Sequence, residues 1–155
     1  MTLDEAELVR WGRSIGESVT APVFIGLSGP LGAGKSVLAR AIGRGAGVTE
    51  SMPSPSYTLV QRYDGRPGLE VVHLDLYRIG SPDELAELGW NQLGGDEEIV
   101  LVEWPERAGD LMPSDHWLIR LDVPDEDPLL RDIEVSRVGS PPGLVGFPMS
   151  VTETP

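Results

Sequence analysis

Cysteine is absent from this chain of 155 residues, so disulfide bonds and thiolate metal sites are excluded. No stretch approaches the roughly 18 consecutive apolar residues of a membrane-spanning helix, and the N-terminus lacks the basic and apolar regions of a secretory signal. We therefore expect a cytoplasmic protein without membrane contact. Its length predicts one domain with a hydrophobic core of its own.

Positive charge is also scarce. There are 12 Lys and Arg residues against 25 Asp and Glu, which gives a formal net charge of −13. A surface of this sign repels the phosphates of nucleic acids and anionic lipids, so direct tRNA or other nucleic-acid binding is not expected to dominate. An acidic surface is compatible with a basic protein partner, although acidity alone commonly serves only solubility.

Lysine occurs once, at position 35, whereas every other basic residue is an arginine. Residues 29–36 read Gly-Pro-Leu-Gly-Ala-Gly-Lys-Ser and fit the pattern G-x-x-x-x-G-K-[ST] at every fixed position. In such a loop the ammonium group contacts the β- and γ-phosphates as a compact charge, backbone N–H groups surround the anion, and the Ser36 hydroxyl binds Mg²⁺. The predicted nucleotide contacts are Gly29, Gly32, Ala33, Gly34, Lys35, Ser36 and Val37.

The neighbours of this loop support the interpretation. An apolar run of strand type, residues 23–27, precedes it, and apolar side chains recur at helical spacing over residues 36–42. Strand, loop and helix in this order distinguish a phosphate-binding loop from a chance glycine-rich turn. The sequence therefore predicts an α/β P-loop NTPase fold over residues 1–138, with a mainly parallel central sheet flanked by helices. Residues 139–155 show no regular period and predict a mobile tail.

Other elements follow from local patterns. Residues 2–5 resemble a capping box ahead of an amphipathic helix, and residues 81–84 resemble a second one ahead of a helix that ends at Gly89. Residues 57–63 and 70–77 flank a turn and predict a β-hairpin.

A magnesium site beside a P-loop needs a carboxylate from a neighbouring strand. Glu103 follows the continuous apolar run 99–102, which is typical of a strand buried on both faces, and this is the position of a Walker-B acid. Asp75 is a second candidate, on the same strand face as His73, and we expect His73 to be packed or hydrogen-bonded rather than catalytic. One carboxylate can bind the metal while the other orients the attacking water, and the sequence does not assign these roles. The predicted catalytic residues are Lys35, Asp75 and Glu103, and the predicted metal ligands are Ser36, Asp75 and Glu103.

The loop of residues 54–58 connects the P-loop helix to the next strand. In switch-type nucleotide hydrolases such a connection senses the γ-phosphate through a hydroxyl, for which Ser56 and Thr58 are the candidates. A turn stiffened by proline explains the same residues equally well. Because the only lysine is in the P-loop, no N-K-x-D guanine motif exists, and no arginine-rich run indicates the lid of a small-molecule kinase.

Together these segments resemble one family, TsaE (also called YjeE), the bacterial ATPases of the tRNA threonylcarbamoyladenosine pathway. The P-loop alone indicates only an NTPase, whereas residues 73–78 combined with 102–106 are much more specific. The matching segments occur in the family's order and are residues 29–36, 54–60, 73–78, 83–85 with 87–89, and 101–106.

The resemblance implies ATP and Mg²⁺ binding, weak intrinsic hydrolysis, and action with two partners, a TsaD-like catalytic subunit and a TsaB-like scaffold. ATP hydrolysis would reset the complex that modifies adenosine 37 of tRNA, and Trp104 would lie near the site or the partner face. The chain departs from the family pattern at Pro30, where Asp is usual, and at Ser36 and Ser56, where Thr is more usual. The tail after Gly139 is not part of the family core. Two alternatives stay open, a small-molecule kinase on the same fold and a non-catalytic ATP-binding regulator.

Overall fold

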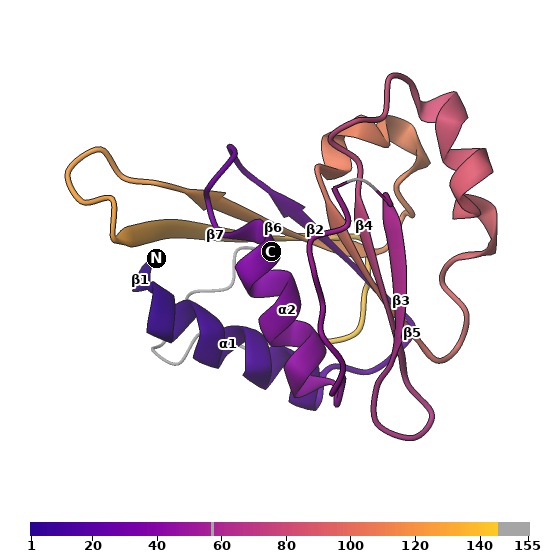
Figure 1. Cartoon of the computed structure of the whole chain (residues 1–155), viewed down its shortest axis with the longest axis horizontal. Helices are drawn as coiled ribbons and strands as arrows, with labels where there is room; N and C mark the ends of the chain where they lie inside the picture. The colour runs from indigo at the N-terminus through magenta and orange to yellow at the C-terminus, as the bar shows by residue number, and fades with distance from the viewer. Residues whose placement is uncertain (57, 146–155) are drawn as a thin grey trace.

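The computed structural model describes residues 1–56 and 58–145, and Figure 1 shows their arrangement. In this part of the chain seven strands form one sheet, in the order β1-β7-β6-β2-β5-β4-β3. The strands are β1 (Thr2–Asp4), β2 (Val23–Ser28), β3 (Val60–Asp64), β4 (Glu70–Asp75), β5 (Glu98–Glu103), β6 (His116–Asp122) and β7 (Leu130–Val138). The helices are α1 (Glu5–Ser18), α2 (Lys35–Gly45) and the 3₁₀ helices η1 (Pro82–Leu88), η2 (Trp90–Gln92), η3 (Pro105–Arg107) and η4 (Gly109–Leu111).

The sheet is mixed, so the expectation of a mainly parallel sheet is wrong. The four adjacent strands β6, β2, β5 and β4 are parallel to one another. Strand β3 pairs antiparallel with β4, and β7 pairs antiparallel with both β6 and β1. The reason lies in the connections. Parallel neighbours need a long crossover, whereas the short links after β3 and after β6 turn the chain straight back beside the strand it has just left. The hairpin predicted over residues 57–77 is confirmed by the pairing of β3 with β4.

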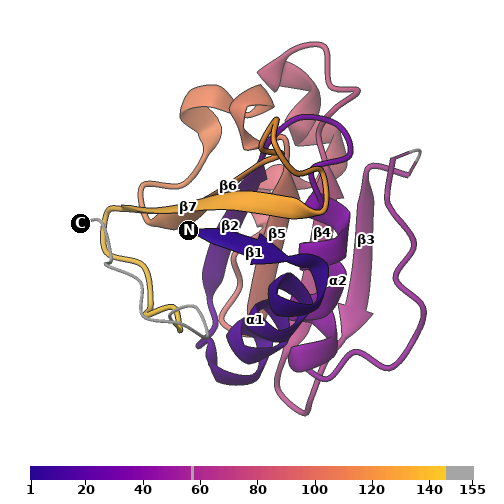
Figure 2. The same ribbon diagram turned by 90° about the vertical axis from the view of Figure 1, so that its left-hand side faces the viewer.

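Hydrophobic side chains cover both faces of the sheet. On β5, Ile99 and Leu101 pack into the cluster that includes α1 and α2, whereas Val100 and Val102 pack with residues of η1 and η2 on the opposite face. This confirms the strand predicted to be buried on both faces. Figures 1 and 2 show α1 and α2 lying against each other and apart from the 3₁₀ helices. Since each fully buried aliphatic side chain contributes about 1.5–3 kcal/mol, these two clusters stabilise the parallel strands.

Helix α1 confirms the predicted amphipathic helix but begins with a different cap. Asp4 accepts a hydrogen bond from the backbone N–H of Glu7 (2.8 Å), and the Glu7 carboxylate accepts one from the N–H of Asp4 (3.1 Å). The capping box therefore joins Asp4 and Glu7 and not residues 2 and 5, because residues 2–4 are strand β1 paired with β7. The buried face carries Leu8, Trp11 and Ile15.

The helix predicted after Ser81 is a 3₁₀ helix, η1, which ends at Leu88 and has Gly89, the predicted end, as its C-cap. Its predicted capping box is absent, since the Ser81 side chain makes no cap hydrogen bond and the Glu84 carboxylate instead accepts from the N–H of Gly80 (3.2 Å). Among the residues of η1, only Leu85 is buried, so little core packing supports a longer α-helix here.

Beyond β7 the chain passes beside β6 and α1. The indole N–H of Trp117 donates to the carbonyl of Pro142 (2.7 Å), and that of Trp11 donates to the carbonyl of Val145 (3.2 Å). Residues 146–155 lie outside the described residues, and the mobility of the tail at 139–155 stays a prediction. No helix in the described part is both long and apolar enough to cross a bilayer.

Candidate nucleotide-binding site

The loop between β2 and α2 has the predicted strand–loop–helix context. Gly29, Gly32 and Gly34 adopt positive φ angles of 143°, 79° and 101°, which side chains of L-residues rarely allow. At Gly29 there is also no space, because a Cβ would lie 2.1 Å from the carbonyl oxygen of Leu121. The glycines of the motif are therefore required by backbone geometry, as the pattern implies.

Lys35, the first residue of α2, points back over this loop. Its Nζ donates to the carbonyls of Gly29 (2.6 Å) and Pro30 (2.7 Å) and lies 4.4 Å from the centre of the Trp104 ring. The side chain is only 5% exposed. The ammonium group is thus held at the opening of the loop by contacts that phosphate oxygens can replace.

Two opposing effects act on the pKa of the Lys35 ammonium group. Burial lowers the pKa of Lys35 from its usual 10.5, whereas the negative charges of Glu103, Asp75 and Glu106 act in the opposite direction. The three carboxylates surround a single ammonium group, so the site gathers more negative than positive charge. Such a surplus favours a divalent cation there.

Two neighbouring strands bring the predicted carboxylates together. Strands β4 and β5 are parallel, and their register places Asp75 directly beside Glu103 at the carboxyl ends of both. The Ser36 hydroxyl is 3.0 Å from each carboxylate oxygen of Glu103, and the Ser56 hydroxyl is 3.3 Å from Oδ2 of Asp75. The three predicted metal ligands therefore converge, with Glu103 nearer the P-loop and Asp75 nearer the loop of residues 54–58.

These groups line a cavity of about 130 Å³. Its lining residues are Leu31, Gly32, Lys35, Ser36, Ser54, Ser56, Asp75, Glu103 and Trp104. The volume suits a phosphate group with a metal ion and not a whole nucleotide, since pockets for complete ligands exceed about 300 Å³. Of the described residues in this lining, Lys35 alone carries a positive charge.

The donor atoms fit Mg²⁺. One hydroxyl and two carboxylates supply the oxygen ligands that this ion prefers, and Mg²⁺ commonly takes its remaining ligands from phosphate and water. In the described part of the chain, no group of three or more His, Cys, Asp or Glu side chains could hold a metal alone. A metal ion at Ser36, Glu103 and Asp75 would therefore need further ligands from outside the protein.

His73 is hydrogen-bonded, as expected, but its partner is Glu103 itself. The Nε2 atom lies 2.6 Å from Oε2 of Glu103, and the ring is fully buried. Its Nδ1 atom is buried without a hydrogen-bond partner among the described residues. The sequence placed His73 and Asp75 on one face of their strand but did not identify Glu103 as the partner of His73, because that contact depends on the pairing of β4 with β5.

The two hydroxyl residues predicted for the switch-like loop lie in different places. Ser56 is in the cavity, and its Oγ is 2.9 Å from Oγ of Ser54, which sequence reasoning did not select. Thr58 is exposed, accepts a hydrogen bond from Gln61 Nε2 (2.9 Å), and is not a lining residue of the cavity.

Trp104 follows Glu103 in a left-handed conformation (φ 59°, ψ 52°). This conformation costs roughly 1–2 kcal/mol for a residue with a side chain. It turns the indole back over the P-loop, where its ring centre lies 4.9 Å from that of Tyr77 and faces the Lys35 ammonium. The residue expected beside the site is thus in direct contact with it.

Arg131 on β7 supports the loop from the other side. Its Nε donates to the carbonyl of Ala33 (2.9 Å) and its Nη2 to that of Gly32 (3.3 Å). The N–H of Ala33 is bonded to the carbonyl of Pro30 (3.1 Å), and Val37 is half-buried beyond the loop. No local signal could have identified Arg131, because it lies 98 residues from Ala33 in the chain.

Comparison with known proteins agrees with this geometry. A family model described as "Threonylcarbamoyl adenosine biosynthesis protein TsaE" matches residues 2–133. This chain belongs to the TsaE family. The family resemblance inferred from residues 29–36, 54–60, 73–78, 83–85 with 87–89, and 101–106 is thereby confirmed.

Individual TsaE proteins match over most of their length. The protein of Haemophilus influenzae named "tRNA threonylcarbamoyladenosine biosynthesis protein TsaE" is 33% identical over 85% of this chain and 84% of its own. The TsaE protein of Mycobacterium tuberculosis is 38% identical over 72% of this chain and 70% of its own. The crystal structure of YdiB from Bacillus subtilis covers 90% of this chain, and this chain covers 86% of it, with a TM-score of 0.70 and 24% identity, which shows a shared fold.

Proposed function

We propose that this TsaE-family protein is a Mg²⁺-dependent ATPase of the cytoplasm that supports threonylcarbamoyl transfer to adenosine 37 of tRNA. The observation that carries this proposal is the convergence of Ser36 and Glu103, 3.0 Å apart, beside the lysine of a P-loop. A hydroxyl after the P-loop lysine and an acid at the end of a buried strand are the two groups that hold the metal in P-loop hydrolases. The proposed role in tRNA modification is taken from the names of its relatives.

The charged side chains of the cavity and the Ser36 hydroxyl each have a part in the proposed hydrolysis. Ser36 and Glu103 would hold Mg²⁺, and the bound ion would neutralise charge on the phosphates. Lys35 exchanges its bonds to the loop carbonyls for bonds to phosphate oxygens, so its charge stabilises the transferring group. Asp75, which is 3.3 Å from the Ser56 hydroxyl, would orient the attacking water and accept its proton.

The cavity also suggests why the activity needs partners. Lys35 is the single cation among the described lining residues, and Arg107 lies outside this lining with Nη1 3.3 Å from the carbonyl of Ile79. An arginine supplied in trans raises phosphoryl-transfer rates by about 10³ or more. We propose that TsaD-like and TsaB-like proteins complete the site or order the loop of residues 54–58. Direct tRNA binding is not part of the proposal, because the chain carries a net charge of −13.

The test is steady-state phosphate release by the isolated protein and by its mixture with both partners. We expect slow release alone and a large rise on mixing, abolished in both cases by Lys35→Ala. Rapid release that partners leave unchanged would contradict the proposal and favour the kinase alternative. Tight ATP binding with no turnover in the complete mixture would favour a non-catalytic regulator.

A further inference from the structure

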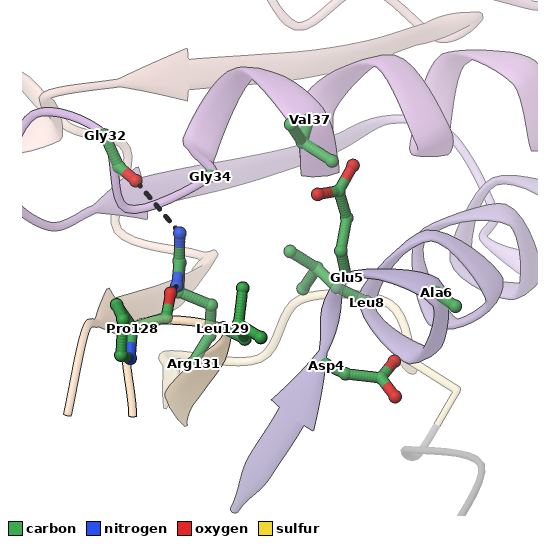
Figure 3. A pocket seen from close by; sticks show the side chains of 10 residues that line it. All are labelled: Asp4, Glu5, Ala6, Leu8, Gly32, Gly34, Val37, Pro128, Leu129 and Arg131. Carbon is green, nitrogen blue, oxygen red and sulfur yellow. Dashed lines mark hydrogen bonds between the residues drawn. The ribbon is translucent and has the colours of Figure 1, made fainter. Parts of the chain in front are cut away.

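Two side chains that do not line the phosphate cavity contact the groups that form it. From β7, Arg131 donates to the carbonyl of Gly32 (3.3 Å) and so holds the backbone of the loop (Figure 3). From β4, the Nε2 atom of His73 lies 2.6 Å from Oε2 of Glu103, a predicted ligand of the metal ion. The two contacts therefore act on different parts of the site, the loop that surrounds phosphate and the carboxylate that meets the metal.

We propose that His73 is a positioning residue for Mg²⁺, whose ring fixes one oxygen of the Glu103 carboxylate and thereby orients the other towards the ion. The inference rests on the proposed Mg²⁺-dependent hydrolysis, in which Ser36 and Glu103 hold the ion, and it adds a residue that sets the affinity for the metal. Because the His73 ring is fully buried, it acts through Glu103 and not by touching the nucleotide.

The Glu103 carboxylate has two different kinds of contact. Both of its oxygens lie 3.0 Å from the Ser36 hydroxyl, whereas His73 contacts Oε2. Ser36 and Glu103 line the cavity, so an ion bound by both would take the place of the hydrogen bond between them. His73 is outside that lining, and its contact with Oε2 need not break when the ion binds. The His73 contact can therefore orient the carboxylate both before and after metal binding.

The pair is held by the sheet itself. The register of β4 and β5 places His73 beside Leu101, two residues before Glu103, so the ring and the carboxylate project from the same face. Both strands are buried over most of their length. Mg²⁺ demands nearly ideal octahedral geometry, so a ligand held in one orientation binds it better than one that rotates freely. Loss of a hydrogen-bond partner of a metal ligand typically weakens metal binding by about 10–100-fold.

The second ring nitrogen argues against a purely stabilising role for His73. Because an ionised carboxylate only accepts hydrogen bonds, Nε2 is the donor to Glu103. The Nδ1 atom is buried without a hydrogen-bond partner among the described residues, and a buried polar atom in that state costs free energy. An apolar side chain would avoid this cost if the position served packing alone. Placement of one N–H group against Glu103 explains why an imidazole is present.

The proposed role can be separated from general stability by one ratio, the affinity for ADP in excess Mg²⁺ divided by the affinity in EDTA. This ratio measures how strongly the metal and the nucleotide support each other's binding. A residue that only stabilises the fold leaves the ratio unchanged in the folded protein. A residue that orients a metal ligand lowers it.

Calorimetric titration of the full chain with ADP under the two conditions tests the proposal. We expect His73→Leu to weaken binding in Mg²⁺ about tenfold or more and to leave binding in EDTA nearly unchanged. His73→Gln should keep most of the ratio, because its amide nitrogen extends about as far as Nε2 and can donate to Glu103. His73→Asn, whose amide is too short for this contact, should behave like His73→Leu.

A double variant tests whether His73 acts through Glu103. Glu103→Gln should itself lower the ratio, and adding His73→Leu should then cause no further fall. Losses that multiply in the double variant would show that the two residues act independently and would overturn the proposal.

Two further variants control for general damage. Ile99→Val shortens a buried side chain of β5, and Arg131→Met removes the contact with the loop backbone, so both should keep the wild-type ratio even where stability or overall affinity falls. A similar fall of the ratio in these controls, or an unchanged ratio in His73→Leu, would overturn the proposal. If His73→Leu does not fold, equal ratios in His73→Gln and His73→Asn would overturn it.

The outcomes also separate this inference from the proposed ATPase. If the wild type shows a high ratio that His73→Leu retains, His73 is not a positioning residue, and the proposed Mg²⁺-dependent hydrolysis stands. A wild-type ratio near one would show that the metal does not contribute to nucleotide binding, and both proposals would then fail.

Discussion

His73 and Glu103 form a buried pair in which Nε2 of the ring lies 2.6 Å from Oε2 of the carboxylate. The two residues come from the parallel neighbours β4 and β5. The same carboxylate accepts a hydrogen bond from the Ser36 hydroxyl on α2. The buried His73 ring thus orients the Glu103 carboxylate, which faces the P-loop.

Replacing His73 by Leu should therefore destabilise the fold. The change leaves the buried Glu103 carboxylate with the Ser36 hydroxyl but without its contact to His73, and we expect the free energy of unfolding to fall by about 1–3 kcal/mol. Urea denaturation measures this fall. His116→Leu is the control, because His116 is only half-buried and contacts a single carbonyl, that of Pro113 (2.7 Å), so its loss should be smaller. Equal losses in the two variants would argue against a special role for the His73–Glu103 pair.

Substitution of Lys35 should abolish hydrolysis even when the charge is kept. Lys35→Ala removes the positive charge that would stabilise the transferring phosphate, and we expect the rate of hydrolysis to fall at least about a hundredfold. Lys35→Arg should lose nearly as much, because the space between the loop carbonyls and the Trp104 ring suits a compact ammonium and not a planar fork. Phosphate release with both partners present measures the effect. Near-normal turnover by Lys35→Arg would contradict the steric argument.

Substitutions of the two carboxylates at the strand ends, Glu103 and Asp75, should affect nucleotide binding and hydrolysis differently. Glu103→Gln should weaken Mg²⁺-dependent nucleotide binding, because Glu103 lies beside the Ser36 hydroxyl. Asp75→Asn should keep binding but slow hydrolysis, because Asp75 contacts the Ser56 side of the cavity. Titration with nucleotide in the presence and absence of Mg²⁺, combined with turnover measurements, distinguishes them. The reverse pattern would exchange the two roles.

Tyr63 should make the stability of the fold sensitive to alkaline pH. Burial, followed by the charge of Glu50, raises the pKa of Tyr63 above its usual 10.0, so the folded state resists ionisation that the unfolded state undergoes. This contribution to stability is complete below pH 10 and is lost as the pH rises from there towards the folded-state pKa. Unfolding free energies of the wild type and Tyr63→Phe between pH 8 and pH 11 measure it, and the variant should lack this component of the decline.

Tyr63→Phe should also be neutral or stabilising at pH 7, by up to about 1 kcal/mol, because the hydroxyl is buried without a hydrogen-bond partner among the described residues. Tyr77→Phe is the matched control, since Tyr77 is 42% exposed and should leave stability nearly unchanged. A clear loss of stability in Tyr63→Phe would show that its hydroxyl makes a favourable interaction.

The sequence by itself determined the features that depend on short-range chemistry. The P-loop could be identified because glycines at set positions are required for its positive φ angles, and Lys35 and Ser36 follow directly. Glu103 could be identified because a continuous apolar run marks a strand buried on both faces, whose end lies at the edge of the sheet. The membership in the TsaE family follows from the same segments.

The tertiary structure decided what depends on pairing between distant segments. The antiparallel pairing of β7 with β6 and β1 and the start of α1 at Glu5 were not predicted, because strand β1 exists only through its pairing with β7. The pair His73–Glu103 depends on the register of β4 and β5, and the contact of Arg131 with the P-loop joins residues far apart in the chain. A local pattern carries no information about register or about the approach of distant strands, so only the folded chain could place these side chains around the phosphate loop.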